Sequence, residues 1–110
     1  MAGSDLFTGT LDLLVLQAVT SGPRHGYGIG RWIRDSTSDV LDVQEGALYP
    51  ALHRLERKGL LSEEWGRTDR NREAKFYSLT PQGRAQLRAE VARWNRYAQA
   101  VGAALAASRA

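Results

Sequence analysis

Two stretches of this 110-residue chain carry side chains suited to hold a polyanion. In residues 42–58, an amide, a phenol and an imidazole follow one another at Gln44, Tyr49 and His53. In residues 66–75, four cations stand against two acids, and the cations are Arg67, Arg70, Arg72 and Lys75. Amide side chains pair with adenine edges, whereas hydroxyl and cationic groups bind phosphate oxygens. These residue types are compatible with contact to a polyanion such as a nucleic acid.

Catalytic and metal-binding chemistry has little support. The chain has no cysteine, which excludes disulfides, thiolate zinc sites and cysteine nucleophiles. His25 and His53 lack the spacing of metal ligands, and no serine stands in a nucleophile elbow. The glycines of residues 26–30 follow no predicted strand and lack the spacing of a dinucleotide-binding loop. We expect no enzyme activity, no metal and no cofactor.

Composition is that of one globular domain, with 43% apolar and 25% charged residues. The net charge of +3 is a weak indication of a polyanionic partner. The positive excess is concentrated beyond residue 82, where five arginines stand against one glutamate, while residues 1–79 sum to −1. Any nucleic-acid surface must therefore be local.

The apolar run around Leu13–Val19 is too short to cross a bilayer, and residues 1–5 lack the basic start of a secretory signal. Without cysteine, nothing argues for an oxidising compartment. We expect a cytoplasmic protein that does not contact the membrane.

The first predicted helix spans Thr10–Val19, with Thr8 or Thr10 as its N-cap. Apolar residues cover nearly its whole circumference, so that it must be covered on all sides. The core of so short a chain can cover one side only. The other side, which includes Leu14, predicts a partner subunit.

A second helix is expected over residues 26–35, with Tyr27, Ile29 and Ile33 facing inward and Trp32 as a further inward candidate. In the third, Leu48, Leu52 and Leu55 form an inward stripe. Residues 42–45 fit a capping box at its start, and residues 58–59 fit a C-terminal cap.

Residues 61–65 and 75–79 alternate as strands do, with a polar hairpin loop over residues 66–74. The last helix begins with Thr80 at the cap and Pro81 at its first position. Its apolar residues follow a heptad spacing for nearly three repeats, at Leu87, Val91, Trp94, Ala98, Val101 and Leu105.

This order predicts a mainly helical α+β fold, the winged helix-turn-helix, with three helices and a two-stranded wing. We expect a DNA-binding domain over residues 5–80 and a dimerisation helix over residues 81–108.

The run Gly46-Ala47-Leu48-Tyr49-Pro50-Ala51-Leu52-His53-Arg54-Leu55-Glu56, followed by Gly59-Leu60, resembles the signature of PadR-type transcriptional regulators. So do residues 25–29 before it, and Trp65-Gly66 and residues 72–83 after it. The single C-terminal helix is similar to the smaller PadR subgroup. The resemblance covers about Leu11 to Leu105 and implies a bacterial repressor that binds a palindromic operator as a homodimer through its first and last helices.

On this interpretation the helix over residues 46–58 enters the major groove and the hairpin lies on phosphates or in the neighbouring minor groove. The residues expected to contact double-stranded DNA are Gln44, Gly46, Ala47, Tyr49, Pro50, His53, Arg67, Arg70, Asn71, Arg72 and Lys75. Gly46 permits close approach of the backbone. Ala47 departs from the commonest family pattern, which has serine or threonine, and offers a methyl contact instead.

Each assignment has a structural alternative. Tyr49 also fits a half-buried core tyrosine, and His53 a solvated helix residue. Arg54 and Arg57 fit surface ion pairs with Glu56 or other acids, and the wing fits a solvated hairpin.

The expected dimer interface comprises Leu14, Leu87, Val91, Trp94, Ala98 and Val101. Near the two-fold axis, paired Trp94 indoles could stack on a small aromatic ligand, as the resemblance to small PadR regulators also implies; packing without ligand is the alternative. A winged helix that binds only other proteins is the competing function, and the slightly acidic sum over residues 1–79 keeps this alternative open.

Overall fold

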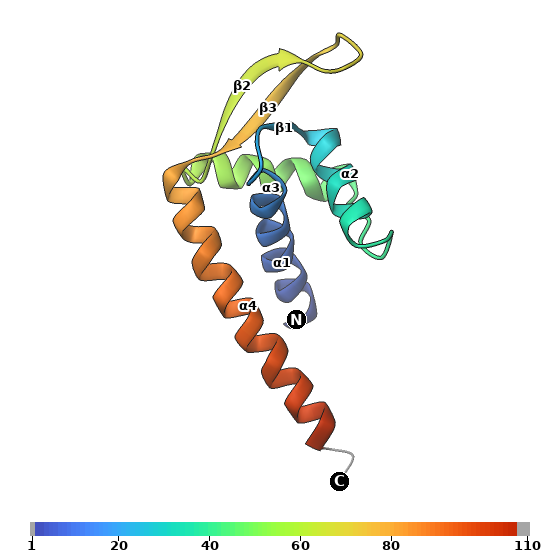
Figure 1. The fold of residues 1–110 in the computed structure, drawn as a ribbon, viewed down its shortest axis with the longest axis vertical. Helices are drawn as coiled ribbons and strands as arrows, with labels where there is room; N and C mark the ends of the chain where they lie inside the picture. The colour runs from blue at the N-terminus through green and yellow to red at the C-terminus, as the bar shows by residue number, and fades with distance from the viewer. Residues whose placement is uncertain (1, 108–110) are drawn as a thin grey trace.

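The computed structural model describes residues 2–107, with side chains from Gly9 onward (Figure 1). The elements follow in the order α1 (Ala2–Ala18), β1 (Arg24–His25), α2 (Gly26–Ser36), α3 (Glu45–Arg57), β2 (Leu61–Arg67), β3 (Glu73–Leu79) and α4 (Pro81–Ala107). Three helices, a β-hairpin wing and a long final helix confirm the predicted mainly helical α+β architecture of a winged helix-turn-helix.

Helix α1 begins much earlier than predicted, so the assignment of Thr8 or Thr10 as its N-cap is wrong: both residues lie inside the helix. No proline occurs before residue 23 to end a helix here. Val15 is fully buried and Leu16 nearly so, while Leu13 and Leu14 are only partly covered. One side of α1 therefore supplies the core of the domain.

Helix α2 places Ile29 and Ile33 in the core as predicted, with Trp32 packed at its edge. The inward placement of Tyr27 is wrong, because its side chain is 64% exposed. Residues two apart on a helix point in nearly opposite directions, so burial of Ile29 turns Tyr27 outward. The imidazole of His25 caps this helix, since its Nδ1 accepts a hydrogen bond from the Gly28 amide at 3.1 Å.

Helix α3 buries the predicted stripe of Leu48, Leu52 and Leu55. The predicted capping box over residues 42–45 is wrong. The helix starts later than that motif requires, with Gln44 at the N-cap and no side-chain capping bond. The carboxylate of Asp42 lies instead 4.0 Å from Arg34 on α2. Lys58 is the C-cap as expected, and Gly59 follows in the left-handed region at φ 77°.

An ion pair joins α3 to α1. The Arg54 guanidinium donates from Nη2 to Oδ1 of Asp12 at 2.7 Å, and both side chains are mostly covered. Arg54 thus forms an ion pair, as its structural alternative predicted, and its partner is an acid on another helix.

The wing is longer than predicted. Both strands run seven residues, paired antiparallel from Leu61 opposite Leu79 to Arg67 opposite Glu73. The sheet has a third strand, β1, which pairs with β3 and gives the order β1-β3-β2. Two residues carry no periodicity, so β1 has no signal in the sequence.

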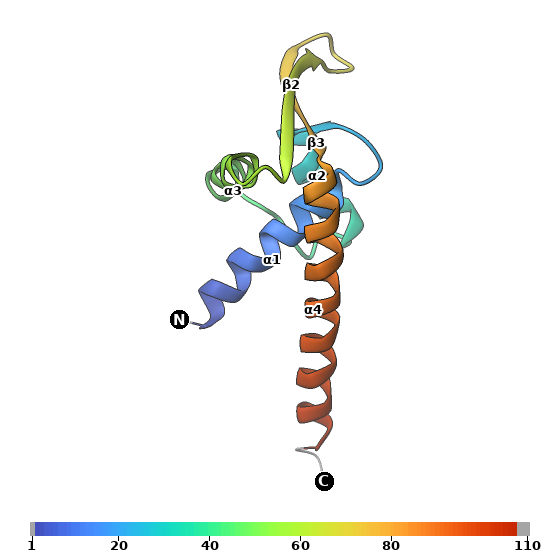
Figure 2. The same cartoon turned by 90° about the vertical axis from the view of Figure 1, so that its left-hand side faces the viewer.

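Helix α4 begins as predicted. The Thr80 hydroxyl accepts from the Gly83 amide at 2.9 Å and donates to the Gly59 carbonyl at 2.7 Å. Leu87 is buried against the domain, but every residue of α4 from Ala92 to Ala107 is exposed. The second half of α4 accordingly extends away from the domain (Figure 2), and the molecule measures 58 × 28 × 26 Å.

Candidate nucleic-acid interface

A concave surface lies between the start of α2, the exposed face of α3 and the wing. This surface, the α2–α3–wing groove, encloses about 1020 Å³. Five residues predicted to contact DNA line it together, namely Tyr49, His53, Arg70, Arg72 and Lys75. Two stretches that are separate in the sequence thus contribute to one surface.

The exposed side of α3 carries most of the remaining predicted contacts. Gln44, Gly46, Pro50 and His53 are all exposed. A methyl group built at Gly46 would meet no atom of the chain within 4 Å, so the fold itself does not require glycine there. Ala47 is half-buried and packs against the core, which turns part of its methyl group away from solvent.

Tyr49 packs its ring on the first residue of α2. A Cβ atom at Gly26 would lie 2.7 Å from the Tyr49 hydroxyl oxygen and 2.8 Å from Cε1, closer than any van der Waals contact. The tyrosine side chain nevertheless stays 40% exposed. Gly26 therefore provides the space in which the ring lies, with part of that ring still open to the groove.

The tip of the wing is a tight turn over residues 68–72. The Thr68 amide donates to the Arg72 carbonyl at 2.9 Å, and the Asn71 amide donates to the Thr68 carbonyl at 2.8 Å. Asn71 adopts φ 62°, a left-handed conformation that asparagine tolerates better than most residues. Asn71 thus has a clear backbone role in closing the turn.

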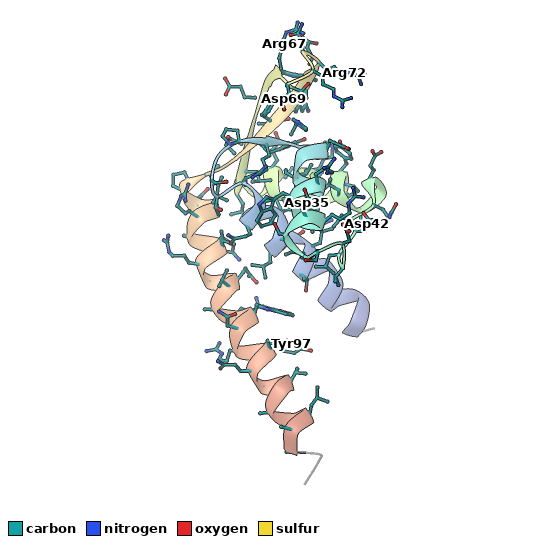
Figure 3. All side chains as sticks on the ribbon, turned by 45° about the vertical axis from the view of Figure 1, so that its right-hand side comes forward. Asp35, Asp42, Arg67, Asp69, Arg72 and Tyr97 are labelled. Atoms are coloured by element: carbon teal, nitrogen blue, oxygen red, sulfur yellow. The ribbon has the colours of Figure 1, made fainter. Side chains whose placement is uncertain are left out.

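The arginines of the wing differ in their freedom. Arg67 donates from Nη1 to the Asn71 carbonyl at 3.0 Å and so braces the turn. Arg70 and Arg72 are exposed, and they bond to the turn through their backbone: the Thr68 hydroxyl accepts from both amides, and the Arg72 carbonyl accepts from the Thr68 amide. Arg67 and Arg72 lie at the outer end of the wing beside Asp69 (Figure 3).

Lys75 is occupied within the chain. Its Nζ lies 2.9 Å from Oε1 of Glu63 and 5.7 Å from the centre of the Trp65 ring. The hydrogen bond to Glu63 raises the pKa of Lys75. On α3, Glu56 shares a hydrogen bond with Glu63, and this bond raises the pKa of Glu56. A polar chain therefore links the wing to α3.

A second hollow, the α1–α4 groove, lies between α1 and α4 and encloses about 510 Å³. It is lined by Gly9, Thr10 and Leu13 from α1 and by residues of α4 that include Trp94 and Tyr97. The Trp94 and Tyr97 rings lie 6.0 Å apart between centroids and are tilted by 41°. Tyr97 projects from α4 in Figure 3.

The predicted dimer residues differ in how far their own chain covers them. Trp94 and Val101 are each 40% exposed, and Ala98 is exposed as well. Leu14 and Val91 are half covered, and Leu87 is only 6% exposed. The apolar surface open to a partner therefore lies mainly on α4 beyond Val91.

Within residues 2–107 no helix is both long and apolar enough to span a membrane. No group of three or more histidine, aspartate or glutamate side chains among the described residues is arranged to hold a metal ion.

The pattern of the transcriptional regulator PadR-like family matches residues 15–89. This chain belongs to that family. The match runs from α1 into α4 and includes the whole wing, α3 and the α2–α3–wing groove. Because the family is one of transcriptional regulators, the match supports the expectation that this PadR-like chain is not an enzyme.

Relatives of similar length agree with this assignment. The PadR-like chain is 31% identical over 94 residues to uncharacterized protein X of Lysinibacillus sphaericus, a match that covers 86% of each chain. It is 32% identical to a PadR family transcriptional regulator from Eggerthella lenta, with a TM-score of 0.77 over 94% of this chain and 88% of the other. A transcriptional regulator from Clostridium thermocellum superposes with a TM-score of 0.80 at 26% identity, over 89% and 95% of the two chains.

Two groove residues of this PadR-like regulator were not among the predicted contacts. Tyr27 accepts a hydrogen bond from Nη1 of Arg31 at 3.3 Å, and this bond lowers the pKa of the phenol. Trp65 is 65% exposed on the wing. The two-residue offset from Ile29 could have identified Tyr27, whereas Trp65 shares a face of β2 with the buried Leu61, so alternation gave no signal for its exposure.

Proposed function

We propose that this PadR-family regulator binds double-stranded DNA as a homodimer and represses transcription from a palindromic operator. The observation that carries the proposal is the α2–α3–wing groove, which joins the exposed face of α3 to the free arginines of the wing. A groove of this kind offers one helix for base edges and one cationic hairpin for phosphates, the two parts of winged-helix recognition.

In the proposed complex α3 enters the major groove. Gln44 and His53 point to base edges, and Gly46 and Pro50 form the surface that approaches the DNA. Tyr49 donates its hydroxyl to a phosphate from a position that its packing on Gly26 defines. Ala47 contributes at most a methyl contact, because half of it is covered by the core.

The wing supplies the phosphate contacts. Arg70 and Arg72 have exposed guanidinium groups that are free to reach the neighbouring backbone. Arg67 and Asn71 hold the turn that presents them. The modest net charge of +3 is compatible with this role, because residues 66–75 carry four cations against two acids.

The dimer forms through α4, with α1 beside it. The exposed surface of Trp94, Ala98 and Val101 supports this assignment, because a long apolar seam on one chain is stabilised when a second copy covers it. Two α3 helices then lie about one turn of DNA apart. A regulator with this role acts in the bacterial cytoplasm, where the operator is.

A small aromatic effector is the proposed signal that releases the repressor. The observation in favour is the α1–α4 groove, where Trp94 and Tyr97 form an aromatic pair beside Arg93 and Glu90. Planar cationic dyes titrated against tryptophan fluorescence test it. Quenching in the native protein that is lost in Trp94→Ala supports the site, and an identical response in both contradicts it.

Selection of bound duplexes from a random pool tests the main proposal. Enrichment of a palindrome whose half-sites lie one helical turn apart is the expected result. A protein that retains no duplex at low ionic strength would instead be a winged helix used for protein interactions, the alternative that the charge of residues 1–79 keeps open.

A further inference from the structure

Trp65 is a large apolar side chain left uncovered by its own chain. It lies on β2 and is 65% exposed, although tryptophan is on average a well-buried residue. Trp65 shares the face of β2 that buries Leu61, but it lies four residues further along the strand, toward the outer end of the wing. The exposure of Trp65 therefore follows from its position along the wing, beyond the core.

The exposed ring is on the side of the wing that faces α3. Leu61, Glu63 and Trp65 alternate along β2 and so project from one face of the sheet. Leu61 is buried in the core, and so is Tyr77, which lies directly opposite Glu63 on β3, and this burial identifies that face. Trp65 also lines the α2–α3–wing groove together with Tyr49 and His53.

Lys75 holds the ring in place. Trp65 and Lys75 are directly opposite each other on β2 and β3, and the ammonium group lies 5.7 Å from the ring centre. The same ammonium group is 2.9 Å from the Glu63 carboxylate, which compensates its charge. Because the Glu63 carboxylate compensates the charge of Lys75, the attraction of this ammonium group to a DNA phosphate is weakened.

We propose that Trp65 is a DNA-contacting side chain, packed on the deoxyribose and phosphate edge of the duplex where the wing meets it, and that Lys75 is a positioning residue for Trp65. The proposal rests on the DNA binding proposed above. Charge complementarity argues for DNA as the occupant, because the ring lies between the exposed face of α3 and the free guanidinium groups of Arg70 and Arg72. The apolar CH face of a deoxyribose suits an indole flanked by cations.

Single-tryptophan proteins test the contact. In Trp32→Phe/Trp94→Phe, only Trp65 remains, and a saturating duplex selected as above should protect its fluorescence from acrylamide. The matched control is Trp32→Phe/Trp65→Phe, whose Trp94 lies on α4 outside the α2–α3–wing groove and should be quenched equally with and without DNA. Bound duplex that leaves Trp65 as accessible as before overturns the proposal.

Affinity measurements test the division of roles. Trp65→Ala should weaken binding roughly tenfold, through loss of an aromatic contact, while Trp65→Phe keeps most of the affinity. Lys75→Met should weaken DNA binding without changing the salt dependence of the affinity. Lys75→Arg should keep the affinity of the native protein. In the Trp65→Ala background, Lys75→Met should have no further effect.

A decrease of about one in the salt slope of Lys75→Met would make Lys75 a phosphate ligand and overturn its positioning role. Failure of the two proposals is distinguishable. A protein that binds no duplex refutes the proposed function, whereas a protein that binds duplex with Trp65 unprotected refutes only this inference.

Discussion

Tyr49 shows how a glycine on one helix defines the position of a side chain on another. Its ring occupies the space that a Cβ atom at Gly26 would need, and it still presents an open edge to the groove. Position 26 thus affects the surface proposed to contact DNA without being part of that contact.

We predict that Gly26→Ala weakens DNA binding roughly three- to tenfold, the effect of losing one phosphate hydrogen bond. Because Tyr49 is 40% exposed, its ring can rotate outward, and the free energy of unfolding should fall by less than about 1 kcal/mol. Fluorescence anisotropy and urea unfolding measure the two quantities. Gly30→Ala is the control, since its methyl group would meet only Leu48 Cδ2 at 3.8 Å. Equal affinity of the two variants would contradict the role of Tyr49.

Arg70 and Arg72 are the cations that the turn leaves free, and they should act on all sequences alike. We predict that Arg70→Ala/Arg72→Ala weakens binding to every duplex and flattens the salt slope by about two, one counterion per lost phosphate contact. Arg84→Ala/Arg88→Ala removes the same charge from exposed positions of α4 and should leave the slope unchanged. If the wing substitutions leave the salt slope unchanged, Arg70 and Arg72 do not contact phosphates.

Among the elements, the junction of the wing with α4 tolerates the least change. A Cβ atom at Gly83 would lie 2.0 Å from the Leu60 carbonyl oxygen, a backbone atom that cannot move without disturbing β2. The Thr80 hydroxyl bonds on both sides of the same junction. The start of α4 is thereby held against the wing.

We predict that Gly83→Ala lowers the free energy of unfolding by about 3 kcal/mol, through overpacking against the backbone. Gly46→Ala adds the same methyl group in open space at the start of α3 and should raise stability by up to about 1 kcal/mol. Urea unfolding at equal protein concentration compares them. A Gly83→Ala protein as stable as the native one would mean that the junction can relax.

Helical and strand periodicity was enough to predict the elements that bury a repeating stripe. Leu48, Leu52 and Leu55 defined α3, and alternation defined β2 and β3, because burial of one face imposes those spacings. The start of α3 could not be predicted in the same way. Asp42 satisfies the capping motif equally well in sequence, yet in the fold it lies beside Arg34.

The sequence was enough to predict which residues belong to the candidate site, but not what each of them contacts. The cations of the wing are evident from composition, but their partners are contacts across strands and across the turn, such as Glu63 with Lys75 and Arg67 with Asn71. Those contacts depend on register and on a left-handed residue at Asn71, which composition does not report.

At the scale of the whole molecule, α4 carries an apolar seam, and every residue of α4 from Ala92 to Ala107 is exposed. An exposed seam of this length predicts association, because water-exposed apolar area is stabilised by burial.

We predict that Val101→Glu makes the protein monomeric at micromolar concentration, since it places a charge in the seam. Ala103→Glu is the matched control: it adds the same charge two residues away, on nearly the opposite side of α4, and should stay dimeric. Sedimentation equilibrium measures both. Identical association of the two variants would show that the seam is not the interface.

The ion pair between Asp12 and Arg54 has a mechanical consequence for signalling. Asp12 is the neighbour of Leu13, which lines the α1–α4 groove, and Arg54 is the neighbour of His53, which lines the α2–α3–wing groove. A hydrogen bond of 2.7 Å is broken when its atoms separate by about 1 Å, so a larger shift of α1 must either move α3 with it or break the bond between Arg54 and Asp12. In the proposed complex, a molecule bound beside Trp94 that moves α1 would act on α3 through this ion pair as well as through the packing of the two helices.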